Sequence, residues 1–392
     1  MGKHYDYIIT GGGCSGLSLA VRMANDAFFQ DKKILIIEES KKDKDDRTWC
    51  FWEAKKGCFE EIVSKKWQNV YFYSDFFNKK LNMSPYEYKM VSGLDFYNYC
   101  KNIFAKKNNI EFLNAKVERI GEEQNKPFAV VNGEKISAEK IFNSIIFEQP
   151  NQSNTHNLLQ HFKGWYIETE MPFFNPNEAT LMDFRIEQKE EVRFFYVLPT
   201  TETKALIEFT IFSTQLLENE KLYDTEIEKY LNNFLKLDKY KVFHEEFGII
   251  PMTNAKFEES LSENIINIGI NSGMARPSTG YTFTNIQRQS DELLILMKAQ
   301  KSLIRSKSWW KMRHLIYDAT ILHVMRFNKY AGAKLFARLF RWNSPKQIFK
   351  FLDADTHFLE EYRIMNTTPI LVFLPVFLKE MFGNVNREKR KS

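Results

Sequence analysis

Apolar and polar positions at the start of the chain follow the order strand, turn, helix, strand. An apolar run at residues 7–9 is typical of a buried β-strand, and it leads into a G-x-G-x-x-G turn at residues 11–16. Apolar residues then recur at helical spacing over residues 17–24, and the run at residues 33–37 predicts the next strand. The sequence therefore predicts a βαβ unit at its beginning.

The three glycines of this turn have the spacing of a dinucleotide-binding motif. Gly11 permits the tight turn, Gly13 lets the backbone approach a pyrophosphate, and Gly16 lets the helix pack closely on the strand. The helix then presents free N–H groups and a positive dipole end to the phosphates, with Cys14 and Ser15 at that end. We therefore expect these five residues to contact a dinucleotide.

An acidic residue at the end of the second predicted strand supports this interpretation. Glu38 follows Gly16 by 22 residues, which is the expected place for a carboxylate that binds ribose hydroxyls. An acid at this position favours an adenosine ribose without a 2′-phosphate, so either FAD or NAD fits. The alternative is a structural βαβ unit with an empty site.

The remaining pattern predicts a β-rich region and then a return to the first one. Segments typical of strands occur at residues 110–117, 128–131, 140–144, 165–170, 179–184, 193–199 and 205–212. Residues 221–237 predict a helix, and a strand, a glycine-rich loop and a helix follow at residues 265–269, 269–281 and 283–298. A second glycine loop beside a helix N-terminus suits FAD, whereas NAD alone does not need it.

This order of elements predicts a discontinuous nucleotide-binding domain in an α/β protein. We expect a nucleotide domain at residues 1–150 and 245–300, a β-rich substrate domain at residues 151–244 and a helical region at residues 301–392. The helical region mixes aromatic and basic residues, which suits a membrane surface as well as packing on the core. Residues 369–378 are apolar but too short to span a bilayer, so we expect a buried helix or a surface contact there.

Composition changes this picture in three respects. The 55 basic and 50 acidic residues leave a formal charge of +5 without a long charged block, which argues against a nucleic-acid partner. Four cysteines without metal-ligand spacing favour reduced thiols in a cytoplasmic protein and indicate no metal site. The 35 phenylalanines are about twice the usual share. Two explanations fit this excess of phenylalanine. One is a large apolar interior or binding tunnel, and the other is a source genome with AT-rich codons.

Four segments together resemble the lycopene cyclase family of FAD-dependent enzymes. They are residues 6–16, residues 46–53 (Asp-Arg-Thr-Trp-Cys-Phe-Trp-Glu), residues 206–210 (Leu-Ile-Glu-Phe-Thr) and residues 273–283 (Gly-Met-Ala-Arg-Pro-Ser-Thr-Gly-Tyr-Thr-Phe). The first segment is generic to flavoproteins, whereas the second and fourth are distinctive. The resemblance implies an FAD/NAD(P)-binding Rossmann-like nucleotide domain of the glutathione-reductase type, with an interleaved β-rich substrate domain and a helical C-terminal region.

The resemblance also implies a reaction, namely ring closure at the ends of linear lycopene. The product is β-carotene, formed through γ-carotene, and there is no net redox change. The family nevertheless needs reduced FAD, with NAD(P)H as the usual electron source, and acts on lycopene and related linear carotenes. Because the substrate dissolves in membranes, we expect a cytoplasmic protein that associates with the membrane surface.

Glu208 is the proton donor that this chemistry favours. Protonating an isolated alkene needs a carboxylic acid that stays protonated, and burial among apolar groups raises a carboxyl pKa. Glu208 lies mid-strand between apolar neighbours, where plant-type relatives carry two adjacent acids; here the second position is Phe209. The alternative is a solvent-facing residue on an alternating strand.

The resemblance adds further candidate residues and leaves other functions open. Glu53 is a candidate second acid, although the aromatic motif around it is equally consistent with structural packing. The candidates to hold or position the flavin are Arg47, Gly273, Met274, Arg276 and Thr279. The alternative functions are an FAD-dependent monooxygenase or polyprenyl reductase of the same fold, and a carotenoid-binding flavoprotein without catalytic activity.

Overall fold

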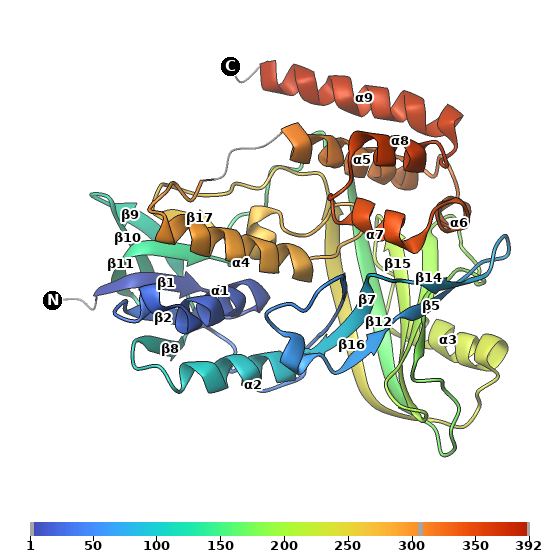
Figure 1. The fold of residues 1–392 in the computed structure, drawn as a ribbon, viewed down its shortest axis with the longest axis horizontal. Helices are drawn as coiled ribbons and strands as arrows, with labels where there is room; N and C mark the ends of the chain where they lie inside the picture. Colours follow the sequence, from blue (N-terminus) through green and yellow to red (C-terminus); the bar gives the residue numbers. More distant parts are fainter. Residues whose placement is uncertain (1–3, 305–308, 390–392) are drawn as a thin grey trace.

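A mostly parallel sheet forms one side of the molecule. The computed structural model describes residues 4–304 and 309–389. The strands of the first sheet are β8 (Ile110–Asn114), β2 (Ile34–Glu38), β1 (His4–Thr10), β11 (Glu134–Asn143), β10 (Lys126–Val131) and β9 (Arg119–Glu123), in this order, with β17 (Ile265–Asn267) beside β11. Strands β8, β2, β1, β11 and β17 pair in parallel, as the predicted βαβ pattern requires. Figure 1 shows this sheet at the left.

Three helices cover one face of this sheet. They are α1 (Cys14–Asn25), α2 (Gly93–Phe104) and α4 (Phe283–Lys298). Their apolar sides bury a shared core with β1 and β2, in which Leu19 and Phe96 are inaccessible to solvent. Helix α4, which follows the second glycine loop, packs beside α1, which follows the first. The FAD/NAD(P)-binding α/β fold predicted from the sequence is therefore confirmed.

A second, mainly antiparallel sheet forms the other side. Its strands are β16 (Lys241–Thr253), β12 (Asn157–Glu168), β15 (Lys204–Ser213), β14 (Val192–Pro199), β13 (Glu178–Asp183), β5 (Asn69–Tyr73) and β6 (Lys79–Asn82), in this order. The predicted boundary at residue 245 falls inside β16, which pairs along its length with β12, so the β-rich part extends to residue 253. Residues 69–82 also join this sheet, although the prediction assigned them to the nucleotide domain.

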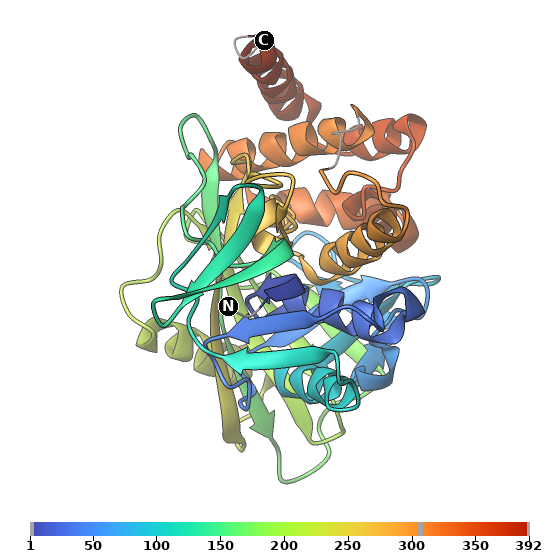
Figure 2. The same ribbon diagram turned by 90° about the vertical axis from the view of Figure 1, so that its left-hand side faces the viewer.

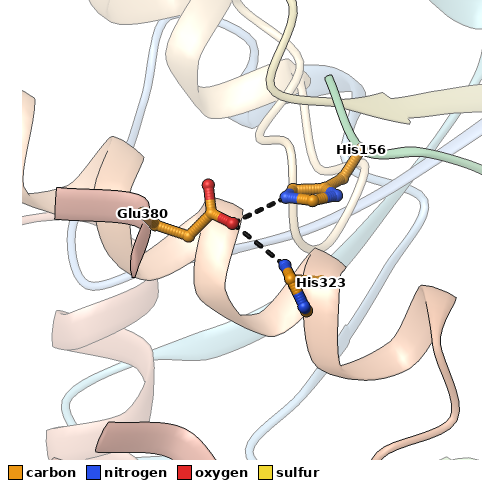
Figure 3. Close-up of side chains that lie close together, drawn as sticks. All are labelled: His156, His323 and Glu380. Atoms are coloured by element: carbon orange, nitrogen blue, oxygen red, sulfur yellow. Dashed lines mark hydrogen bonds and ion pairs between the residues drawn. The ribbon is translucent and has the colours of Figure 1, made fainter. Parts of the chain in front are cut away.

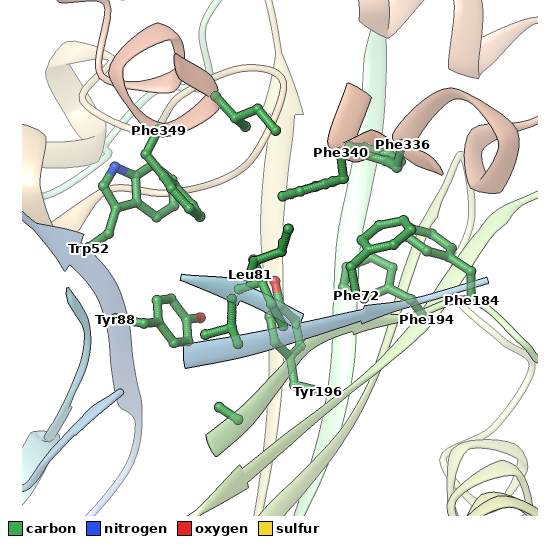
Figure 4. Close-up of a cluster of buried hydrophobic side chains, with 14 of the residues drawn as sticks. Trp52, Phe72, Leu81, Tyr88, Phe184, Phe194, Tyr196, Phe336, Phe340 and Phe349 are labelled. Carbon is green, nitrogen blue, oxygen red and sulfur yellow. The ribbon is translucent and has the colours of Figure 1, made fainter. Parts of the chain in front are cut away.

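Alternation along these strands gives the second sheet two different faces. One face packs against α3 (Lys221–Tyr230), with Phe209 and Tyr223 fully buried between them. The other face packs against the C-terminal helices α5 (Trp309–Arg326), α6 (Gly332–Trp342) and α7 (Pro345–Leu352). Figure 4 shows the aromatic cluster on this second face, with Phe72 and Phe194 from the strands, Phe184 directly after β13, and Phe336 and Phe340 from α6.

A small sheet joins the two halves. Its strands are β3 (Thr48–Glu53), β7 (Glu87–Ser92) and β4 (Lys65–Trp67). On β3, Phe51 stacks on Phe283 of α4, with ring centroids 4.2 Å apart, and so belongs to the nucleotide-domain core. Trp52 points to the opposite side and belongs to the core of the second sheet. The aromatic motif predicted from the sequence is therefore the strand that packs the two cores against each other.

The C-terminal helices end in α9 (Ile370–Lys389), which lies outermost on α5 (Figures 1 and 2). Glu380 of α9 is buried, and its Oε1 hydrogen-bonds His156 Nε2 at 2.8 Å and His323 Nδ1 at 3.0 Å (Figure 3). His156 precedes β12 and His323 lies on α5, so one carboxylate links three segments. Leu371, on the same helix, is 89% exposed. Within residues 4–304 and 309–389, no helix is long and apolar enough to cross a membrane.

We predict that Glu380→Gln loosens α9 from the body of the protein. Hydrogen bonds to a charged group are worth about 1.5–3 kcal/mol, and the variant removes the charge that both imidazoles share. Hydrogen exchange of α9 amides should become faster, while Lys379→Gln on the exposed side of the same helix should leave it unchanged. Equal exchange in wild type and Glu380→Gln would contradict this role.

Acid should weaken the same linkage. Burial lowers the pKa of His323. For Glu380, burial acts to raise the pKa, but the hydrogen bonds from the two histidines outweigh this effect and lower it. As the pH falls below about 6.5, His323 therefore binds a proton more readily in the unfolded chain than in the folded one. Below about 4.3 the same holds for Glu380. The stability supplied by these groups is present at neutral pH and lost on acidification, which urea unfolding at pH 7.5 and pH 5 should detect in wild type.

Candidate active site

Two glutamates face each other across a glycine in the second sheet. In the strand register, Gly164 of β12 lies directly opposite Glu208 of β15 on one side and Glu246 of β16 on the other. Residues that lie directly opposite each other project to the same face, so both carboxylates lie on one side of the sheet. A Cβ at Gly164 would lie 2.8 Å from Leu206 Cδ1 and 3.2 Å from Glu246 Cγ, so a larger residue at this position would displace these side chains.

Burial keeps this pair of carboxyl groups partly protonated. Burial raises the pKa of Glu208 to about 7, although Thr210 Oγ1 donates a hydrogen bond to its Oε1 at 2.8 Å, which favours the ionised form. Burial, and after it the charge of Glu208, raise the pKa of Glu246 to about 8. Near neutral pH the two groups together therefore hold about one proton.

Aromatic side chains surround this face of the sheet. Tyr196 lies directly opposite Glu208 in the register with β14. Its hydroxyl is 3.3 Å from that of Tyr281, which in turn is 3.2 Å from the hydroxyl of Tyr88 (Figure 4 shows Tyr88, Tyr196 and Trp52). Burial raises the pKa values of all three phenols, so they are neutral at physiological pH. The acids thus lie in an apolar, aromatic site with hydroxyl groups at its edge.

The two glycine-rich loops meet at the N-terminus of α1. Gly11 has a φ of 93°, and a Cβ at Gly16 would lie 2.0 Å from the carbonyl oxygen of Gly11, so both positions require glycine. A Cβ at Gly269 of the second loop would lie 2.4 Å from Ser15 Oγ. Among the described atoms, none lies within 4 Å of a Cβ built on Gly13, so the loop surface is open there. This cradle fits a dinucleotide pyrophosphate.

Glu38 reaches the first loop from the end of β2. Its Oε2 accepts a hydrogen bond from the N–H of Gly12 at 2.6 Å, and its Oε1 accepts one from the N–H of Ser40 at 2.8 Å. The carboxylate is therefore held beside the glycine turn, where the sequence predicts contacts with a ribose. The assignment of Glu38 to ribose binding stays a prediction.

The other predicted cofactor residues lie around the same loops. Arg47 is half-exposed and pairs with Asp46 at 3.2 Å, and its charge acts on the Cys14 thiol. Burial raises the pKa of that thiol to about 12, so Cys14 is an inert packing residue at the loop. Gly273 has a φ of 76°, and Met274 packs against the nucleotide-domain core. Their contacts with a cofactor stay predictions.

Thr279 shows best that the second loop fits a cofactor. Its Oγ1 is buried without a hydrogen-bond partner in the described part of the chain. The residue lines a small cleft together with Trp52 and Tyr281. A buried hydroxyl without a partner is costly, and a polar group of a bound flavin would satisfy it.

The structure gives Glu53 and Arg276 structural partners. Glu53 Oε2 lies 3.1 Å from Nζ of buried Lys89, on the face of β3 opposite to Trp52 and away from Glu208. The Arg276 guanidinium is buried and its Nε lies 3.2 Å from Asp318 on α5. Arg276 therefore ties the second glycine loop to the C-terminal helices, and neither residue shares the site of the two glutamates.

Comparison with known proteins agrees with this architecture. The family model described as lycopene cyclase protein matches residues 6–376. The chain belongs to this family. Neoxanthin synthase from the chloroplast of Solanum tuberosum is 24% identical over 301 residues, which cover 71% of this chain and 57% of that protein. The chain thus matches little more than half the length of this curated relative.

Solved structures show the same fold at low sequence identity. A flavoprotein/dehydrogenase from Cytophaga hutchinsonii superposes with a TM-score of 0.66 at 12% identity, covering 97% of this chain and all of the other. A geranylgeranyl bacteriochlorophyll reductase-like protein from Thermoplasma acidophilum gives a TM-score of 0.57 at 13% identity, covering 98% and 100%. These structures support an FAD-binding fold for this member of the lycopene cyclase family.

Glu246 is the site residue that the sequence analysis did not identify. It lies in the segment between residues 238 and 264, for which no element was predicted. The alternation of β16 is readable in the sequence, but the register that places Glu246 beside Glu208 depends on β12, about 80 residues earlier. No local pattern carries that information.

We predict that Thr210→Val raises the pKa of Glu208 above its value of about 7. The variant removes a hydrogen bond to the ionised form, which should raise the pKa by roughly one unit. The carboxyl C=O stretch in infrared titrations, with Glu208→Gln as the subtraction reference, measures this shift. Thr210→Ser keeps the hydroxyl and should titrate as wild type; an unshifted Thr210→Val would contradict the assignment.

Proposed function

We propose that this protein is a lycopene β-cyclase, an isomerase that closes both ends of lycopene to form β-carotene through γ-carotene. The observation that carries the proposal is the pair of partly protonated carboxyl groups in an aromatic site of a lycopene cyclase family member. An isolated alkene is a weak base, so its protonation requires an acid held in its neutral form away from water. Glu208 meets this requirement.

The surroundings of Glu208 suit the carbocation that follows protonation. Aromatic faces attract a cation through their quadrupole, and Tyr196, Tyr281 and Trp52 supply such faces on this side of the sheet. The raised pKa values of the phenols keep them neutral, so they do not capture the cation as phenolates.

FAD is the cofactor that the two loops fit. We propose that Gly11, Gly13 and Ser15 hold its pyrophosphate, that Glu38 binds its ribose, and that Thr279 contacts its flavin ring. Bound in its reduced form, with NAD(P)H as the electron source, FAD would supply negative charge that stabilises the carbocation without being consumed. The small sheet places the loop of Thr279 next to the aromatic side chains over Glu208.

The substrate class also implies contact with a membrane surface. Apolar side chains are exposed on α9 and on helix α8 (Phe358–Met365), which precedes it in the chain. They belong to Phe358, Leu359, Tyr362, Ile370, Leu371, Leu374, Leu378 and Phe382. We call these residues the apolar stripe. We propose that the apolar stripe rests on the bilayer, from which lycopene enters the protein.

The decisive test is conversion of lycopene in liposomes by purified protein supplied with FAD and NAD(P)H. Wild type should form a product of unchanged mass, with reductant needed only to reduce the flavin. Glu208→Gln should lose at least about 100-fold in rate, because a general acid contributes that much, while its flavin content stays the same. NAD(P)H consumption in proportion to product would indicate a monooxygenase or a reductase, and bound but unchanged lycopene a carotenoid-binding protein.

Membrane contact has a separate test. Leu371→Glu combined with Leu378→Glu should weaken sedimentation with lipid vesicles by about tenfold or more, because each buried leucine contributes about 1.5–3 kcal/mol. Ile295→Glu, at an exposed position of α4, is the matched control and should bind vesicles as wild type does. Unchanged sedimentation of the double variant would exclude the apolar stripe as the contact.

A further inference from the structure

Ring closure by protonation needs a base as well as an acid, and the second glutamate is placed to supply it. Resting on the proposed function, we propose that Glu246 accepts the proton that leaves the cyclised carbocation and then returns it to Glu208. The two side chains project from the same face, two strands apart, on either side of Gly164, over which the Leu206 side chain also lies. Neighbouring strands are about 4.8 Å apart, so the two backbones are about 10 Å apart, and the charge of Glu208 acts on the carboxyl group of Glu246.

Glu246 has a free position for the incoming proton. The residue is buried, and its Oε2 has no hydrogen-bond partner among the described residues. By contrast, Oε1 of Glu208 is occupied by the hydroxyl of Thr210. A buried carboxylate oxygen without a donor favours protonation, although a hydrogen bond between Thr48 and the same carboxyl group partly offsets this effect.

The other polar groups around the pair are poorly suited to act as the base. Tyr88, Tyr196 and Tyr281 are neutral phenols, and burial raises the pKa of the Cys50 thiol well above its usual value. Burial raises the pKa of the Tyr166 phenol, although its hydrogen bond with Thr48 lowers it. Asp45, whose charge also acts on Glu246, is held by Ser92 and by the N–H of Leu94, each at 3.1 Å. Glu246 is therefore the group near Glu208 that titrates close to neutral pH.

The proton balance closes with these two residues alone. Glu208 donates its proton to the terminal double bond, and the resulting cation forms the ring by attack of a second double bond. Glu246 then removes a proton from a ring carbon, whose C–H electrons become the ring double bond. The product is an isomer of the substrate, and the proton passes from Glu246 back to Glu208. Burial raises the pKa of both carboxyl groups into the neutral range, so either group can carry the shared proton.

The experiment compares Glu246→Gln and Glu246→Asp with Glu208→Gln in the liposome assay. Glu245→Gln is the matched control, since its carboxylate lies on the opposite face of the same strand and pairs with Lys163. Product analysis separates ring isomers that differ in the position of the new double bond, because a cation without its assigned base loses other protons. Flavin absorbance and thermal unfolding report whether each variant is folded.

Glu246→Gln should lose at least about 100-fold in rate or form misplaced ring double bonds. Glu246→Asp, which keeps the carboxylate, should recover part of both properties, and Glu245→Gln should match wild type. Wild-type rate and product from folded Glu246→Gln would overturn the role of Glu246 while leaving the cyclase intact. If wild type itself forms no cyclic product, the proposed function fails instead. If Glu246→Gln does not fold, Glu246→Asp decides, since a reduced rate or misplaced ring double bonds in folded Glu246→Asp support the role, whereas wild-type rate and product oppose it.

Discussion

The burial of two carboxyl groups side by side in an apolar site is the constraint on which the rest of the structure depends. Among the described residues neither acid has a cationic partner, so burial favours their protonated forms instead of an ion pair. The surrounding sheet makes this arrangement possible, because its hydrogen bonds satisfy the backbone while a residue larger than Gly164 would displace the Glu246 side chain. Buried Lys89 and Arg276 each form an ion pair with other acids.

The small sheet connects the nucleotide-domain core to the core that contains Glu208. Strand β3 presents Phe51 to one core and Trp52 to the other, since successive side chains of a strand point to opposite faces. The second glycine loop carries Thr279 and Tyr281 on the same short segment, and Arg276 fixes it to α5. A displacement of either core would therefore change the distance between the cofactor loops and Glu208.

The sequence predicted the fold well because its signals are local. The glycine spacing at residues 11–16 and the apolar runs of β1 and β2 each lie within one element, and the structure confirms the elements they predict. The pairing of Glu208 with Glu246 was not predictable, because it depends on the register of three strands that are distant in the chain. The exposure of residues 370–378 and the buried ion pair of Arg276 also depend on packing that no local pattern records.

Strand geometry also explains why Phe209 does not weaken the case for Glu208. Because side chains alternate, position 209 faces α3, where Phe209 is fully buried against Tyr223. An acid there would lie in a different core and could not share the site of Glu208. A second acid that acts together with Glu208 must come from another strand at the same level of the sheet, and in this chain that position is occupied by Glu246. The alternation of one strand and the register of its neighbours thus determine which carboxylates can exchange a proton.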